Sequence, residues 1–203
     1  MKTKLFIDFD DTLFDRNTFR QRLISLIKKQ GFSDKEVEDG YKAVYKNNGY
    51  DGVWTHLEYL HKKVRPIDLE KATSDVDSLF FEAKKLLFPD ALKFLRHIDR
   101  KKYEINLITV GGLEFQKEKV RACEILSVFD NCYFTTEEKA DMLAKLVGDK
   151  FFILLEDKDE TIKSVRKRFP RALVIKAEKS KLLDSLKLLN SENYARITGS
   201  RNN

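Results

Sequence analysis

Apolar and polar residues alternate in a way that predicts a short buried strand followed by a long helical region. Residues 4–9 are mostly apolar and predict a strand, whereas residues 16–87 contain no convincing strand pattern. In that region the apolar positions recur at the three- and four-residue spacing of amphipathic helices. Four helices are expected there. Ser33 and Glu36 fit a capping box at the start of the second, and Asp68 can cap the fourth.

After Pro89 the pattern becomes a strict alternation of short apolar runs and amphipathic helices. The expected helices cover residues 90–99, 113–126, 137–147, 159–169 and 179–189, and the expected strands cover 103–109, 132–135, 151–155 and 172–176. Short apolar strands separated by helices are typical of βαβ units. Such units build a parallel sheet with helices on both faces.

The two patterns together predict an α/β fold in two parts. Residues 1–14 and 89–190 are expected to form a Rossmann-like parallel sheet core with helices on both faces, and residues 15–88 an inserted all-helical cap domain. The polar residues 191–203 are expected to be a flexible tail. Ligands of open parallel sheets bind beyond the carboxyl ends of the strands. The cap leaves the core at that edge, so it can act as a lid.

Composition narrows the class of protein. Of the 203 residues, 42% are hydrophobic and 35% charged, which is typical of a globular protein with a charged surface. No apolar run approaches the roughly 18 residues of a membrane span, so no membrane partner is expected. The chain has no apolar leader before a cleavage site, and Cys123 and Cys132 are too few for a disulfide framework. We therefore expect a cytoplasmic protein.

The net charge of +6 raises the question of a nucleic-acid partner. Lysines and arginines are interleaved with acidic residues along the chain, as on solvated helix faces, so nucleic acid is not an expected partner. A basic surface can instead draw anionic small molecules toward a site.

Aspartates crowd the end of the first predicted strand, at Asp8, Asp10, Asp11 and Asp15. Because side chains alternate along a strand, Asp8 and Asp10 point the same way and repel each other. Protonation of one carboxyl group, relaxation by solvent, or a cation between them would relieve this repulsion. A simpler interpretation is that Asp10, Asp11 or Thr12 caps a helix or a turn.

Other predicted strands deliver further polar residues to the same edge. Thr109 and Val110 lead into a glycine turn that suits a bound phosphate, Lys139 lies near a helix start, and residues 156–160 form a second acidic cluster. Taken singly, each feature has a simpler interpretation: an ordinary turn, a solvated helix lysine, and acidic residues that complement a helix N-terminus. Their convergence instead favours a divalent cation beside a phosphate, with Mg²⁺ as the natural candidate.

The stretch FIDFDDTL resembles the DxDxT motif of the haloacid dehalogenase-like (HAD) superfamily, and the resemblance extends over about residues 1–177. It implies that Asp8 is a nucleophile that forms an aspartyl-phosphate and that Asp10 is the general acid/base. The helical insertion is similar to the α-helical cap that this superfamily carries between its first two motifs.

Later motifs of the superfamily also have counterparts. LITVGG resembles the second motif, which implies that Thr109 binds phosphate; Val110 stands where the family often has Asn. Lys139 falls at the place of the third-motif lysine, so it too is implied to bind phosphate. FILLEDKDETI resembles the fourth motif, which implies that Asp157 ligates Mg²⁺ together with Asp8 and the backbone carbonyl of Asp10.

The resemblance implies a Mg²⁺-dependent phosphatase, a phosphoric monoester hydrolase, whose partner is a small phosphorylated substrate. Glu156 replaces the usual Gly or Asp beside Asp157, which motivates an alternative: a catalytically weak phosphate-binding or regulatory module. A phosphoryl-transferring mutase is a further alternative. A signalling receiver domain fits less well, because such domains are shorter and lack this insertion. Both a monomer and a homodimer are compatible with the sequence.

Aromatic and histidine residues of the insertion are candidates for contact with the substrate. His56, His61 and Trp54 all lie on predicted helices, with Tyr50 and Tyr59 close in sequence. Packing of the helical bundle is the preferred interpretation for them.

Overall fold

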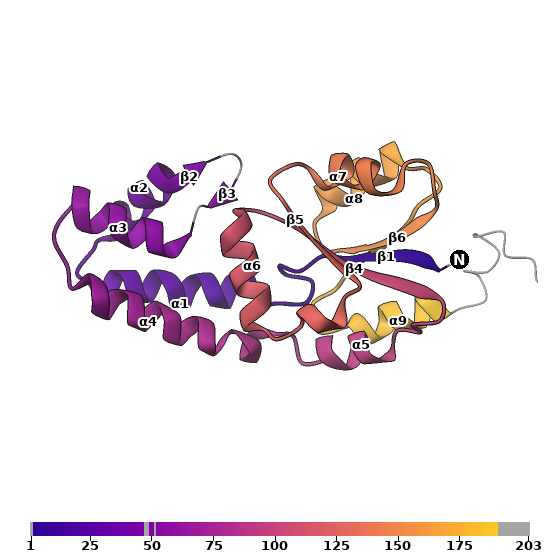
Figure 1. Cartoon of the computed structure of the whole chain (residues 1–203), viewed down its shortest axis with the longest axis horizontal. Helices are drawn as coiled ribbons and strands as arrows, with labels where there is room; N and C mark the ends of the chain where they lie inside the picture. Colours follow the sequence, from indigo (N-terminus) through magenta and orange to yellow (C-terminus); the bar gives the residue numbers. More distant parts are fainter. Residues whose placement is uncertain (1, 47–48, 51, 191–203) are drawn as a thin grey trace, which may run out of the picture.

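A five-stranded parallel sheet forms the core of the structure, a computed structural model that describes residues 2–46, 49–50 and 52–190 (Figure 1). The strands are β1 (Thr3–Ile7), β4 (Tyr103–Val110), β5 (Asn131–Thr135), β6 (Phe152–Glu156) and β7 (Leu173–Lys176). Their order is β5-β4-β1-β6-β7, and every pairing is parallel. The first strand therefore lies in the middle of the sheet, with β4 and β6 beside it.

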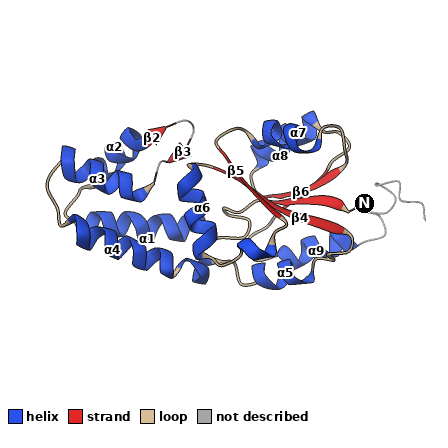
Figure 2. Cartoon of the chain, viewed as in Figure 1, coloured by secondary structure: helices blue, strands red, loops and turns tan. Residues whose placement is uncertain are grey.

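Helices cover both faces of this sheet (Figure 2). One side carries α5 (Ala91–His97) and α9 (Leu182–Asn190), and the other carries α7 (Lys139–Val147) and α8 (Asp159–Arg168). Alternate residues of β1 reach opposite layers: Leu5 and Ile7 join one buried cluster and Phe6 joins another. Because both faces are buried, the strands are almost wholly apolar, which is why short apolar runs revealed them. The predicted α/β fold is confirmed.

The helix after β4 is shorter than predicted. It was expected over residues 113–126, but α6 covers Leu113–Ala122 and a separate 3-10 turn, η2, covers Leu126–Val128. Between them Glu124 adopts a positive φ of 56°, a conformation that an α-helix does not contain. The hydrophobic spacing continues past this break, so the pattern alone could not locate it.

Four helices between β1 and α5 form a cap beside the sheet (Figure 1). They are α1 (Arg16–Lys29), α2 (Asp34–Val44), α3 (Val53–Lys63) and α4 (Leu69–Phe81), followed by the 3-10 turn η1 (Ala83–Leu86). The predicted capping box of Ser33 and Glu36 is present at the start of α2, and the Asp68 side chain accepts the Lys71 N–H at the start of α4. Local capping chemistry thus fixes where these helices begin.

The cap also contains a short β-ladder, so the prediction that residues 16–87 contain no strand was wrong in this detail. β2 (Tyr45–Lys46) pairs antiparallel with β3 (Gly49–Tyr50). The Tyr41 ring stacks on the Tyr50 ring, with centroids 5.0 Å apart, and this contact ties the ladder to α2. Two-residue strands are too short to produce an alternating pattern, so the sequence carried no periodic signal for them.

Packing accounts for the candidate residues of the cap. His56 is buried, its Nδ1 lies 3.0 Å from the Tyr50 hydroxyl, and burial lowers the pKa of His56 to about 4. The Trp54 ring stacks on Phe80, and its indole N–H donates to Asp77. These contacts favour the packing interpretation that the sequence suggested.

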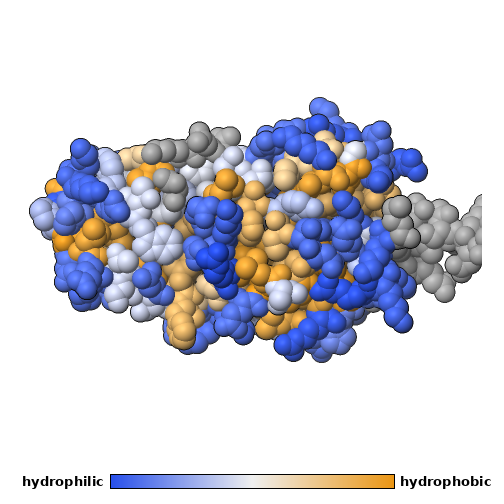
Figure 3. Space-filling view, in the orientation of Figure 1, coloured by the Kyte–Doolittle hydropathy of each residue, from blue (hydrophilic) through white to orange (hydrophobic). Residues whose placement is uncertain are grey.

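Hydrophilic side chains cover most of the helices on the face seen in Figure 3, and hydrophobic ones gather near its middle. Within the described residues, no helix has the length and apolar character that crossing a membrane requires. The tail expected over residues 191–203 lies outside the described residues.

Candidate active site

The first strand delivers Asp8 to the middle of the sheet's carboxyl edge. Its backbone N–H donates to the Leu155 carbonyl at 3.0 Å, which anchors it between the two neighbouring strands. The chain then turns sharply: Asp11 has a φ of 62°, and its N–H donates to the Phe14 carbonyl at 2.8 Å. An aspartate tolerates this left-handed conformation better than most residues. The turn leads directly into α1, so the cap begins beside the site.

Lys139 joins Asp8 to Glu156. It lies at the start of α7, and its ammonium group binds carboxylate oxygens of both residues. All three side chains are buried, so this ion-pair network is largely shielded from water. The second oxygen of Glu156 accepts the backbone N–H of Lys158 at 3.0 Å. The interpretation of Lys139 as a solvated helix lysine is therefore wrong.

Burial and charge repulsion shape the electrostatics of this network. Burial raises the pKa of Asp8 to about 7, and the nearby Glu156 carboxylate adds to the rise while Lys139 opposes it. Burial acts to lower the pKa of Lys139, but the carboxylates of Asp8 and Glu156 raise it to about 12, so the amine keeps its proton. The negative charge of the site is thus only partly compensated.

Three carboxyl groups are placed to hold a cation. One oxygen from each of Asp8, Glu156 and Asp157 lies within 4.8 Å of the others. With all three carboxyl groups ionised, the Lys139 ammonium leaves an excess of two negative charges, which one divalent cation would balance. Burial raises the pKa of Asp157 too, and repulsion from Asp8 and Asp11 adds to it. An all-oxygen ligand set of this kind fits Mg²⁺.

The turn after β4 is partly as expected for a phosphate site. Thr109 is buried near the carboxyl end of β4, the strand that pairs with β1. Val110 is the exposed last residue of β4. The backbone N–H of Gly111, however, donates to the Thr135 carbonyl at 2.9 Å. The Gly111 N–H is therefore not free to bind a phosphate, because the parallel pairing with β5 continues into the turn.

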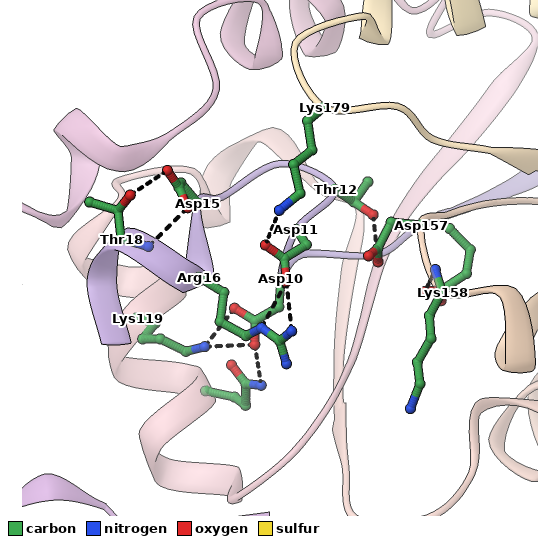
Figure 4. A network of polar contacts seen from close by, with 12 residues as sticks. Asp10, Asp11, Thr12, Asp15, Arg16, Thr18, Lys119, Asp157, Lys158 and Lys179 are labelled. Atoms are coloured by element: carbon green, nitrogen blue, oxygen red, sulfur yellow. Dashed lines mark hydrogen bonds and ion pairs between the residues drawn. The ribbon is translucent and has the colours of Figure 1, made fainter. Parts of the chain in front are cut away.

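Asp10 lies in a second charged network (Figure 4). Its carboxylate binds the Lys119 ammonium at 2.6 and 2.7 Å and the Gln116 side-chain amide at 2.9 Å. Asp10 contributes no side-chain oxygen to the three-carboxylate cluster. The structure thus separates Asp8, bound by Lys139, from Asp10, bound by α6.

Asp11 anchors two cations near the same turn (Figure 4). The Arg16 guanidinium binds one of its oxygens at 2.7 Å, and the Lys179 ammonium binds the other at 2.9 Å. The neighbouring Thr12 hydroxyl lies 3.5 Å from an Asp157 oxygen, which links the turn to the end of β6. The capping interpretation therefore does not describe Asp10 or Asp11, whose carboxylates bind cations.

Sequence reasoning missed the residues that bind Asp10. A signal was present: Gln116 and Lys119 share an i, i+3, i+4, i+7 stripe with Val120 and Cys123, and all four are buried. A lysine on the buried face of a helix requires a partner of opposite charge. Cys123 itself is inert packing, because burial raises the pKa of its thiol to about 12.

Comparison with known proteins identifies the fold. No protein-family profile and no curated protein match the sequence. Among solved structures, a protein from Burkholderia xenovorans LB400, named as a haloacid dehalogenase-like hydrolase, matches with a TM-score of 0.68 and 16% identity, over 94% of this chain and 89% of that one.

Two further structures extend the likeness. YfnB from Bacillus subtilis, a HAD-hydrolase by name and bound to magnesium, matches with a TM-score of 0.59 and 13% identity over 94% of this chain and 99% of that one. A Thermotoga maritima protein named as a beta-phosphoglucomutase matches with a TM-score of 0.56 and 14% identity over 93% and 100%. At these identities the likeness shows the fold.

Proposed function

We propose that this chain, which has the fold of the haloacid dehalogenase-like hydrolases, is a Mg²⁺-dependent phosphatase for a small phosphorylated metabolite. One observation supports the proposal above all. Asp8 ends the central strand with Lys139 bound to its carboxylate and with Glu156 and Asp157 beside it. The residues that we propose as nucleophile, phosphate ligand and metal ligands therefore lie at one edge of the sheet.

In the proposed reaction an Asp8 oxygen attacks phosphorus and the bond to the leaving oxygen breaks, giving an aspartyl-phosphate. Asp10 gives its proton to the leaving oxygen. It then takes a proton from the water that attacks the phosphorus of the aspartyl-phosphate, which frees Asp8. Lys139 neutralises phosphoryl charge, and the Thr109 hydroxyl donates to a phosphoryl oxygen.

The metal would be held by the carboxylates of Asp8 and Asp157, with the Asp10 backbone carbonyl as a further ligand and Glu156 beside them. Bound Mg²⁺ would supply positive charge that lets an anionic nucleophile approach an anionic ester. The uncompensated charge of the three-carboxylate cluster is what makes this ligand set suitable.

A phosphoryl-transferring mutase would share the aspartyl-phosphate, and one structural neighbour is named as such an enzyme. A catalytically weak binding module would keep the fold and the metal but not the turnover. Glu156 motivated this last alternative but gives it little support, because both of its carboxylate oxygens already have a partner. One binds Lys139 and the other accepts the Lys158 N–H.

The test is phosphate release from a panel of phosphorylated metabolites, measured with Mg²⁺ and with a chelator. We expect release from at least one small monoester with Mg²⁺ and about 100-fold less with the chelator. Binding of a phosphorylated ligand without release would favour the regulatory module. Release that is replaced by transfer to a sugar-phosphate acceptor would favour the mutase.

A further inference from the structure

The carboxylate of Asp10 is fixed by helix α6. Its Oδ1 lies 2.6 Å from Lys119 Nζ, and its Oδ2 lies 2.7 Å from Lys119 Nζ and 2.9 Å from Gln116 Nε2 (Figure 4). Both oxygens are therefore engaged, in charge-assisted bonds of good length. The contacts span more than 100 residues of sequence, so only the fold brings them together.

Lys119 is unusually deeply buried for a lysine. Its side chain is 3% exposed, and its ammonium lies 5.3 to 5.7 Å from the ring centroids of Phe9, Phe14 and Phe115. Ring faces attract a cation, but a buried ammonium still needs a carboxylate partner to offset the loss of water. Among the described residues, Asp10 is the carboxylate paired with it. An apolar residue at position 119 would pack without needing a carboxylate partner. We therefore assign a functional role to the charge of Lys119.

The helix that carries these partners also supports the cap. Phe115 packs edge-on against Tyr50 of the cap at 5.0 Å and against Phe80 at 5.9 Å. The position of the Asp10 carboxylate is thus set by a helix wedged between the cap and the core (Figure 1).

We propose that Lys119, assisted by Gln116, is a positioning residue that holds Asp10 for proton transfer. The inference rests on the proposed function, since it assigns Asp10 the proton transfers of that reaction. Proton removal from the attacking water needs an ionised Asp10 oxygen at a fixed place, and the Lys119 ammonium both fixes that carboxylate and stabilises its charge. Lys119 touches neither phosphorus nor substrate, and it acts through Asp10.

The first test separates the two chemical steps in the full-length protein with Mg²⁺ and 2,4-dinitrophenyl phosphate. This leaving group needs little protonation, so in Lys119→Met the phosphorylation of Asp8 stays within about threefold of wild type. Hydrolysis of the aspartyl-phosphate slows about 100-fold, so phosphoenzyme accumulates and kcat and KM fall together, while kcat/KM stays within about threefold of wild type. The matched control is Lys117→Met, because the Lys117 side chain, on the same helix, is only partly buried and pairs with Glu114 at the surface, and it should behave as wild type.

The second test is a double-mutant cycle. If Lys119 acts through Asp10, adding Lys119→Met to Asp10→Asn lowers turnover by less than about threefold beyond Asp10→Asn alone. If Lys119→Met does not fold, Gln116→Leu takes its place in the cycle, because Gln116 also binds Asp10 and its loss leaves no unpaired buried charge.

Multiplicative losses in the cycle would overturn the proposal, as would equal slowing of both steps in Lys119→Met. If the proposed function itself is wrong, wild type will form no phosphoenzyme on Asp8. This result distinguishes a failure of the proposed function from a failure of the role assigned to Lys119.

Discussion

At the scale of single residues, Lys139 is the cation that holds two buried carboxylates together. Its ammonium binds both Asp8 and Glu156, and all three side chains are buried. We expect Lys139→Met to lower the free energy of unfolding by about 3 kcal/mol, because two carboxylates would lose their buried partner. Thermal or denaturant unfolding at neutral pH measures this, and phosphatase activity should be lost as well.

The chain offers a matched control on the same helix. Lys145 is exposed and pairs with Glu137 at the surface, so Lys145→Met should change stability by less than about 0.5 kcal/mol. A Lys139→Met protein as stable as wild type, measured without metal, would show that the buried network does not carry the charge we assign to it.

Site residues could be predicted from the sequence where they follow the end of a predicted strand. Asp8, Lys139 and Asp157 were all expected at one sheet edge, and the structure brings Asp8 and Asp157 into one cluster with Lys139 bound to Asp8. Lys119 was not predicted, since its partner lies 109 residues away and no short motif joins them. Contacts of this kind depend on tertiary packing.

At the scale of elements, the β2–β3 ladder of the cap touches the turn after β4. A Cβ on Gly112 would lie 1.7 Å from the Tyr50 carbonyl oxygen, and one on Gly49 would lie 2.4 Å from the Gly112 nitrogen. Gly112 has an ordinary φ of −59°, so its lack of a side chain matters for this contact and not for backbone freedom. Two glycines thus let the cap rest against the candidate phosphate turn.

We expect Gly112→Ala to destabilise the protein by about 2 kcal/mol, because the ladder or the turn must move to make room. Phosphatase activity should fall too, since Thr109 lies at the end of β4, just before this turn. Unfolding experiments and steady-state kinetics measure both effects. Gly49→Ala should act in the same direction, whereas Leu113→Ala, at an exposed neighbour, should be close to wild type. Wild-type stability in both glycine variants would contradict the contact.

Elements were predictable in proportion to their length. The helices of the cap and the buried strands were identified by their spacing, and capping residues placed the starts of α2 and α4. The ladder of β2 and β3 was missed because two residues carry no period. The early end of α6 was missed because a single positive φ, at Glu124, leaves the apolar pattern unchanged.

At the scale of the whole molecule, the architecture follows from the order of strands and helices. A central first strand, a helical insertion after it and alternating units beyond it make the carboxyl edge of the sheet face the cap (Figure 1). Structural neighbours share this fold at 12–16% identity, so the fold does not require close sequence similarity.

The most direct test of the central claim is to find the residue that carries the phosphoryl group during turnover. The protein is mixed with Mg²⁺ and an activated aryl phosphate, quenched in acid and digested, and the peptides are analysed by mass spectrometry. We predict one phosphoryl group on Asp8 and none in an Asp8→Asn variant that remains folded but inactive. A phosphoryl group on another residue, or undiminished turnover by Asp8→Asn, would contradict the account.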